Sequence, residues 1–356
     1  MNNITKITPP HHLHDGRNAT IDAVKAFAII CVVAGHCIQF GSGSDYMTSN
    51  SFFTEPLFMF IYSFHMPLFM MVSGYLFAIT VGKNTPLDTI KKKAMQLLLP
   101  IIFWSLIPII HKVCEATPDE ISVFKVIKLY IYQLVFLLWF LKSIFINSAI
   151  VVLVRMNFKN SPYAYLLLLL PTFFIPDAAN LDVYKYMYPY FILGYFYHKD
   201  IEGKIKMPPA LIFIVSLVLY ATLMLFFDTD SYIYTSKYMI LKSGSLSLYQ
   251  LHVDVYRFVV GLVGSVMIIS LISIVFPKLH NVIQSAILFL GVNTMGVYII
   301  SDECTGLLIP LTKDFTTFNI SVLIAEVAIV TLFSLLLTLA IKQSRILRCY
   351  LLGMSK

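Results

Sequence analysis

The stretch LIFIVSLVLYATLMLFF, residues 211–227, contains no charged residue and is apolar on every face of a helix. Two further runs, LLLPIIFWSLIPII (97–110) and SVLIAEVAIVTLFSLLLTLAI (321–341), are likewise apolar on every face. A helix on the surface of a soluble protein would show a polar stripe. The chain is 58% hydrophobic and 13% charged, which is too little polar surface to cover so many apolar runs. These features predict an all-α, polytopic integral membrane protein embedded in a lipid bilayer.

The number of membrane helices follows from the thickness of the bilayer, because a hydrocarbon core about 30 Å thick needs about 20 apolar residues per helix. Ten spans are expected, at roughly 20–40, 54–80, 96–114, 136–154, 163–176, 184–198, 209–228, 246–276, 282–312 and 319–341. Two of these, the fifth and sixth, are short enough to form one broken or tilted pair.

The distribution of basic residues predicts the orientation of these helices. With both termini in the cytoplasm, most Lys and Arg residues fall in inner segments, and the first outer loop, 41–55, contains none. The expected organisation is a cytoplasmic tail over 1–19, one transmembrane domain over 20–341 and a basic cytoplasmic tail over 342–356. The net charge of +7 therefore reflects membrane orientation, and no nucleic-acid partner is expected.

Several kinds of chemistry are not supported by the sequence. The five cysteines show no CxxC spacing, so we expect neither a disulfide framework nor a zinc site. The chain contains no Walker loop, no HExxH and no GxSxG motif. Any catalysis is therefore expected to use histidines and buried charges, with no metal.

The first expected membrane helix contains three ionisable side chains. In RNATIDAVKAFAIICVVAGHC, residues 17–37, these are Asp22, Lys25 and His36. At about 100° per residue they share one stripe of a helix, and Asp22 can pair with Lys25 at i, i+3. His36 lies about 16 Å further along the axis than Lys25, so one extended ligand can contact both.

Ionisable residues inside a membrane are costly and usually functional, but two structural alternatives stay open for this helix. Asp22 and Lys25 can form an ion pair at the membrane interface, with the Lys25 side chain extended toward the headgroups. His36 can be a neutral histidine that is hydrogen-bonded to a neighbouring helix.

The second expected helix, FIYSFHMPLFMMVSGYLFAI (60–79), places His65 two residues before Pro67. Proline removes a backbone donor and frees a carbonyl, so a kink is expected beside His65. His65 either has a functional role or is satisfied by the freed carbonyl. Ser73 and Gly74 follow, and Gly74 permits close approach of another helix.

Two later helices also contain buried charges. Arg257 has no loop to reach and can pair with Asp254 at i, i+3. Asp302 and Glu303 lie in the ninth expected span, and we expect at least one of them to pair with a cation from another helix.

Five motifs together resemble the membrane acyltransferase 3 family, whose members O-acylate bacterial surface polysaccharides and other small acceptors. They are IDAVKAFAIICVVAGH (21–36), FHMPLFMMVSGYLFA (64–78), LLWFLKSIF (137–145), YFILGYFYHK (190–199) and LGVNTMGVYII (290–300). Their order and separations match the family over nearly the whole chain, and the fucose-4-O-acetylase type is the most similar. Lys25 occupies a position where many members carry arginine, and Ser301 one where histidine is common.

The resemblance implies an O-acetyltransferase of the bacterial inner membrane, with acetyl-CoA as donor and a sugar or polysaccharide as acceptor. His36 is expected to act as general base for the sugar hydroxyl or as a transient acyl carrier. Asp302 or Glu303 would orient its imidazole, and Arg257 or Lys142 would stabilise the oxyanion. The basic segment 82–96 would attract the CoA phosphates, although Lys91, Lys92 and Lys93 can equally serve as topology anchors.

The expected site therefore has two sets of residues. The catalytic set is His36, Lys25, Asp22, His65, Arg257 and Glu303. The set expected to contact CoA is Arg17, Lys25, Ser73 and Lys142.

Two other functions are compatible with many spans and buried charges. A transporter of polysaccharide or lipid-linked sugar predicts a large aqueous cavity open to either face, but gives no reason for the His36 stripe. A purely structural membrane subunit gives no reason to bury Arg257, Asp302 and Glu303.

Overall fold

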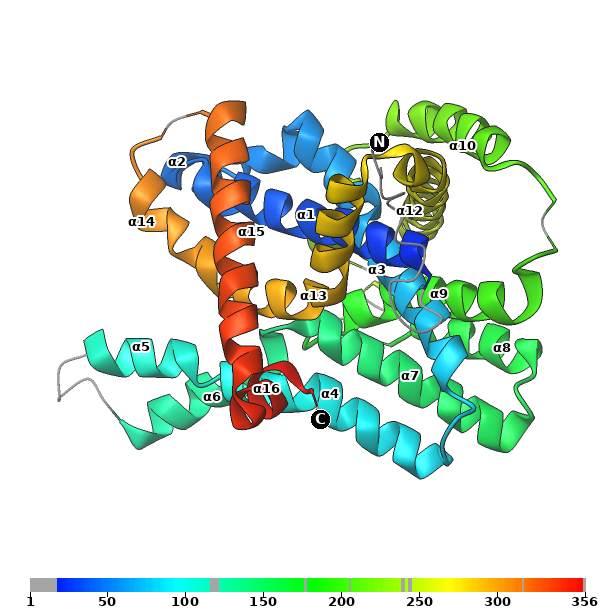
Figure 1. Ribbon diagram of the computed structural model, residues 1–356, viewed down its shortest axis with the longest axis horizontal. Helices are drawn as coiled ribbons and strands as arrows, with labels where there is room; N and C mark the ends of the chain where they lie inside the picture. The colour runs from blue at the N-terminus through cyan, green and yellow to red at the C-terminus, as the bar shows by residue number, and fades with distance from the viewer. Residues whose placement is uncertain are drawn as a thin grey trace, which may run out of the picture.

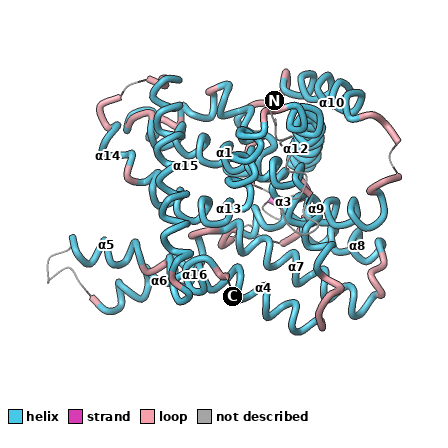
Figure 2. The backbone as a smooth tube through the Cα atoms, in the orientation of Figure 1, coloured by secondary structure: helices cyan, strands magenta, loops and turns pink. Residues whose placement is uncertain are grey.

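The computed structural model describes residues 18–115, 122–175, 178–204, 206–237, 241–242, 245–315 and 317–354. Figure 2 shows that helix accounts for nearly all of this part of the chain. The α-helices are α1 (Ala19–Gly41), α2 (Ser44–Thr48), α3 (Pro56–Thr80), α4 (Pro86–Trp104), α5 (Ile107–Glu115), α6 (Val123–Phe136), α7 (Trp139–Phe158), α8 (Pro162–Thr172), α9 (Leu181–Phe196), α10 (Pro209–Met224), α11 (Ile233–Ser236), α12 (Leu248–Val275), α13 (Asn281–Gly306), α14 (Leu308–Thr312), α15 (Ile320–Gln343) and α16 (Arg345–Leu352).

The remaining elements are short. They are the helical turns η1 (Ser51–Thr54), η3 (Tyr197–Ile201), η4 (Thr229–Ser231) and η5 (Phe276–Lys278), and the two-residue strands β1 (Leu241–Lys242) and β2 (Ser245–Leu246). The two strands pair antiparallel with each other.

The all-α, polytopic membrane class is confirmed. Within the described residues, seven helices are long and apolar enough to cross a bilayer: α1, α3, α4 together with α5, α7, α12 with η5, α13 and α15. The apolar helices α8 and α10 are shorter, and α9 has 16 residues. The count of ten spans stays a prediction.

Helix α1 lies at the centre of the bundle, between α3 and α13 (Figure 1). Its first turn is capped by Asn18, whose side-chain oxygen accepts hydrogen bonds from Thr20 N and Ile21 N. Helices α1 and α13 run in the same direction, because Gly291 meets Asp22 near one end and Asp302 meets His36 near the other. We call these the Lys25 end and the His36 end of the bundle.

Glycines set the closest helix contacts. A Cβ at Gly291 would lie 2.1 Å from the Asp22 carbonyl oxygen, so α13 can approach the α1 backbone only without a side chain there. Helices α3 and α9 make the same kind of contact, because a Cβ added at Gly74 would lie 2.0 Å from Phe191 O and one added at Gly194 would lie 1.9 Å from Met71 O. The expected packing role of Gly74 is confirmed, and Gly194 is its counterpart on α9.

Three segments expected outside the membrane helices contain helical structure. The segment 82–96 was expected as a loop, but α4 begins at Pro86, because Thr85 caps it and proline suits the first helical position. The outer loop expected before residue 136 contains α6. The basic tail after 341 contains the amphipathic helix α16, which lies against α4 at the lower end of α15 (Figure 1).

Candidate functional site

The polar stripe of α1 is turned toward other helices rather than toward the lipid. Lys25 Nζ donates a hydrogen bond of 2.7 Å to Asp22 Oδ1, so the expected i, i+3 pair is confirmed. The side chains of Lys25 and Asp22 are only 16% and 12% exposed. The pair therefore lies inside the bundle at the contact between α1 and α13.

Asp302 of α13 faces His36 at the other end of α1. His36 Nδ1 and Asp302 Oδ1 are 3.9 Å apart, a distance that allows electrostatic attraction but exceeds a hydrogen bond. Among the described residues, His36 Nδ1 is a buried nitrogen without a hydrogen-bond partner. A shift of about 1 Å would form that hydrogen bond. Asp302 therefore faces an ionisable side chain of another helix, and the expected pairing of one of the two acids with a cation stays a prediction.

A tyrosine ring lies beside the residue that precedes His36. The Tyr62 ring packs on Gly35, where an added Cβ would lie 2.5 Å from Tyr62 Cε2. Its centroid is 4.7 Å from that of His65 and 5.9 Å from that of Tyr234. The glycine before His36 therefore makes room for an aromatic ring beside the histidine.

His65 is held in one tautomer by its own helix. Its Nδ1 donates a hydrogen bond of 2.8 Å to Ile61 O, because a carbonyl can only accept. The carbonyl freed by Pro67 is that of Ser63, four residues before the proline, so it is not the one that His65 uses. Helix α3 continues through Pro67, and Nε2 of His65 is left to act as an acceptor.

A cavity of about 320 Å³ lies among α1, α3, α4, α7 and α13. Lys25, Lys93 and Gln96 line it at the Lys25 end, and Val32 and Tyr298 line it at a deeper level. Lys25 and Val32 are seven residues apart on α1, so the cavity extends about 10 Å along that helix. At the deeper level, Val32 lies one helical turn before His36 on α1, and Tyr298 lies one helical turn before Asp302 on α13.

Two residues expected to contact CoA occupy different surroundings. Ser73 of α3 lines the same cavity as Lys25, and its hydroxyl donates to Phe69 O. Lys142 does not line this cavity. Its ammonium donates hydrogen bonds to Leu134 O and Val135 O at the end of α6. Arg17 lies outside the described residues.

Arg257 is buried in α12 with its expected partner. Its Nη2 is 3.0 Å from Asp254 Oδ1, and both side chains are 1% exposed. The same nitrogen donates to Ser236 Oγ, while Nε and Nη1 have no hydrogen-bond partner among the described residues. The i, i+3 pair is confirmed, but the described contacts place Arg257 beside Ser236 and not beside His36.

Two further acids lie near the His36 end. Glu303 follows Asp302, and its Oε1 is buried without a hydrogen-bond partner within the described part of the chain. Glu326 of α15 packs against Gly41 of α1, where an added Cβ would lie 2.3 Å from Glu326 Oε2. The sequence reasoning missed Glu326, although a lone carboxylate in an otherwise apolar run was a visible signal.

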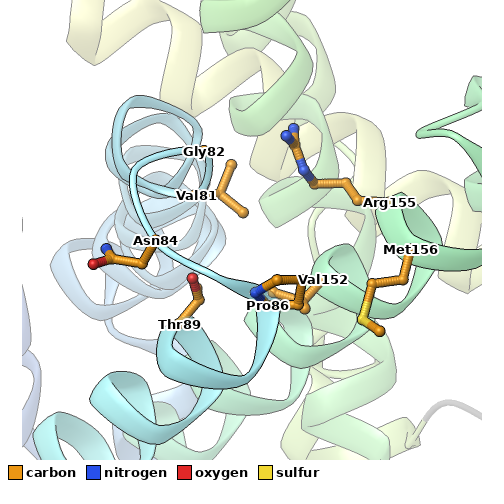
Figure 3. Close-up of a pocket in the computed structure, with 8 residues that line it drawn as sticks. All are labelled: Val81, Gly82, Asn84, Pro86, Thr89, Val152, Arg155 and Met156. Atoms are coloured by element: carbon orange, nitrogen blue, oxygen red, sulfur yellow. The ribbon is translucent and has the colours of Figure 1, made fainter.

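A second cavity, of about 260 Å³, lies where the turn between α3 and α4 meets α7. Figure 3 shows Arg155 extending from α7 toward Gly82. Its guanidinium donates to Tyr195 OH at 2.9 Å, and Tyr195 OH donates to Asn160 Oδ1 at the same distance. Arg155 is therefore part of a hydrogen-bonded group that ties α7 to α9.

Comparison with known proteins decides the family. The family model described as an acyltransferase domain matches residues 18–342. The chain belongs to this acyltransferase family. The match begins at the cap of α1 and includes both ends of the cavity helices α1 and α13, so the described site lies within the matched region.

Two curated relatives are similar to part of the chain. Nodulation protein NolL of Mesorhizobium japonicum (strain LMG 29417 / CECT 9101 / MAFF 303099) is 27% identical over 188 residues, which are 52% of this chain and 49% of the relative. Nodulation protein NolL of Sinorhizobium fredii (strain NBRC 101917 / NGR234) is 29% identical over 189 residues, 53% and 50% of the two chains. The match spans about half the length of these relatives. No solved structure matches the chain.

Proposed function

We propose that this protein is a membrane O-acetyltransferase that moves an acetyl group from acetyl-CoA to a sugar hydroxyl of a bacterial surface polysaccharide or its lipid-linked precursor. The observation that carries the proposal is the cavity that begins at Lys25 and ends one turn from His36. A narrow, mostly apolar cavity with cations at one end suits an acyl-CoA, whose thin arm joins an anionic diphosphate to a thioester.

The donor enters at the Lys25 end. Lys25 and Lys93 both line the cavity there, and their ammonium groups attract the diphosphate. The pantetheine arm extends past Ser73 and Val32, which brings the thioester to the level of Tyr298. Lys25 thus contributes to donor binding, while Asp22 holds its ammonium in place.

The reaction takes place at His36. The neutral imidazole accepts the proton of the sugar hydroxyl as the hydroxyl oxygen attacks the thioester carbonyl carbon. Asp302, 3.9 Å from Nδ1, stabilises the imidazolium that forms. The carbon–sulfur bond then breaks, and the departing CoA thiolate takes the proton from His36. Acetyl ester and free CoA are the products, and the imidazole is neutral again.

The positive-inside pattern supports one orientation of this site. The Lys25 end would face the cytoplasm, where acetyl-CoA is made, and the His36 end would lie in the outer half of the bacterial inner membrane. In this orientation, donor and acceptor would approach His36 from opposite sides. The acyltransferase family favours this reading over the transporter considered from the sequence.

Acetyl transfer in membrane vesicles tests the proposal. Vesicles with the cytoplasmic face outward receive acetyl-CoA labelled in the acetyl group, together with a candidate polysaccharide. Wild-type protein should move label to the polysaccharide, and His36→Ala should lose about 100-fold to 10,000-fold of that rate. The matched control is His252→Ala, because His252 is an exposed histidine on the membrane helix α12.

The outcomes separate the possible functions. Transfer retained in His36→Ala at equal membrane insertion would contradict the catalytic role of His36. Uptake of labelled sugar by vesicles without any acetyl transfer would support a transporter instead. Label that stays covalently on His36 after an acid quench, in the absence of polysaccharide, would identify an acyl-histidine relay in place of direct transfer.

A further inference from the structure

The segment that follows α16 forms part of the wall of the main cavity. Met354 lines this cavity at the Lys25 end, together with Lys25, Lys93 and Gln96. The chain comes from α15, passes through α16 and returns to α4 at this point (Figure 1). The mouth of the cavity is therefore bordered by a residue that is far from the other lining residues in sequence.

This segment is fixed tightly against α4. Gly353 has φ +61, and an added Cβ would lie 2.1 Å from the Gln96 carbonyl oxygen, so only glycine permits this approach. Leu352 is fully buried. The Trp104 indole donates to Leu351 O at 2.9 Å, and Met354 N donates to Arg348 O. These contacts hold Met354 at a defined place on the cavity wall.

The family match ends at residue 342, so this wall is built by residues beyond the matched region. We propose that residues 351–354 form one side of the mouth of the donor cavity at its Lys25 end and that the Met354 side chain contacts the acyl-CoA where the pantetheine arm joins the diphosphate. The inference rests on the proposed function, and it makes Met354 a donor-binding residue that the family motifs do not include.

Charge reversal at residue 354 separates donor contact from simple packing. Met354→Asp and Met354→Lys remove the same apolar side chain, but only the aspartate repels a diphosphate and competes for Lys25 and Lys93. Met354→Asp should raise the KM for acetyl-CoA by about tenfold or more, and Met354→Lys should leave it equal or lower. The kcat should stay within about twofold in both, because His36 lies at the other end of the cavity.

Ile346 supplies the matched control, since it lies on the exposed face of α16, with 67% of its surface accessible. Ile346→Asp and Ile346→Lys should leave the KM unchanged. If a charged variant at 354 fails to insert, Met354→Cys provides a second measurement. Saturating CoA should slow maleimide labelling of that cysteine at least about fivefold, as followed by mass spectrometry of its peptide.

Two results would overturn the inference alone. In the first, the wild type is active, but Met354→Asp and Met354→Lys shift the KM for acetyl-CoA in the same direction or not at all. In the second, the wild type is active, but CoA does not slow maleimide labelling of Met354→Cys. A wild type without any acetyl-CoA-dependent transfer would instead overturn the proposed function, and this inference with it.

Discussion

His36 of α1 and Asp302 of α13 face each other across a gap of 3.9 Å between Nδ1 and Oδ1, on two helices that run in the same direction. The contact of Gly291 with the Asp22 backbone fixes the spacing of these helices at the Lys25 end. The spacing of the helices that carry His36 and Asp302 is therefore set by a backbone contact more than 10 residues away along each helix.

The two neighbouring acids of α13 should differ in their effect on catalysis. Asp302→Asn removes the charge that stabilises the His36 imidazolium, so kcat should fall on the order of 100-fold. Glu303→Gln leaves the facing carboxylate in place and should lose less than about tenfold. Both rates are measured as acetyl transfer at saturating acetyl-CoA. An equal loss in the two variants would show that Asp302 has no special relation to His36.

Lys25 should act on donor binding through its charge. Lys25→Ala should raise the KM for acetyl-CoA about tenfold, while Lys25→Arg should stay within about threefold of wild type. Because Lys25→Ala also removes the cation beside Asp22, the double variant Lys25→Ala/Asp22→Asn serves as control. It should recover thermal stability without recovering the KM. If the double variant recovers both the wild-type KM and the thermal stability, the Lys25–Asp22 pair has a structural role only.

Gly291→Ala should lower the transfer activity, although residue 291 lies at the other end of the bundle from His36. The added Cβ would meet the Asp22 carbonyl oxygen at 2.1 Å, and backbone atoms cannot rotate away. We expect a loss of about 1–3 kcal/mol of stability and on the order of 100-fold in kcat, since small misplacement of catalytic groups is costly. Melting temperature and transfer rate are measured together.

Gly306 is the control for this substitution, because a Cβ added there meets nothing within 4 Å. Gly306→Ala at the end of the same helix should keep both stability and activity. Wild-type activity in Gly291→Ala would show that α1 and α13 can separate without harm to the site.

The buried pair of α12 should contribute to structure. Arg257→Leu removes the cation that faces Asp254 and should destabilise the protein by about 3–5 kcal/mol. The double variant Arg257→Leu/Asp254→Leu buries no charge at these positions and should recover much of that loss. Thermal melting and acetyl transfer are measured on all three proteins. A stable double variant without activity would support the oxyanion role expected from the sequence, and an active one would exclude it.

The sequence predicted most features that depend on residues close together along one helix. Apolar runs identified the membrane helices, and i, i+3 spacing identified the Asp22–Lys25 and Asp254–Arg257 pairs. Period and spacing suffice for such features because both partners belong to one helix. Even so, the start of α4 at Pro86 was missed, because three lysines in its first turns were read as a loop.

Contacts between helices that are far apart in the sequence could not be predicted from spacing. Neither the choice of Asp302 over Glu303 nor the packing of Glu326 on Gly41 follows from any spacing rule. Lys142 was one of two candidates for the oxyanion and an expected CoA contact, but its ammonium donates hydrogen bonds to carbonyls of the unpredicted helix α6. Each case depends on which face of a helix meets which neighbour, and this is decided by packing over the whole bundle.

The central claim is that the donor arm lies along α1 with its thioester at His36. The most direct measurement is a cryo-electron microscopy map of the protein bound to a non-hydrolysable acetyl-CoA analogue. We predict density for the arm between Lys25 and Val32, with the reacting carbon within roughly 3.5 Å of a hydroxyl oxygen placed beside the His36 ring. Density for the arm on any other path, with the carbonyl remote from His36, would contradict the account.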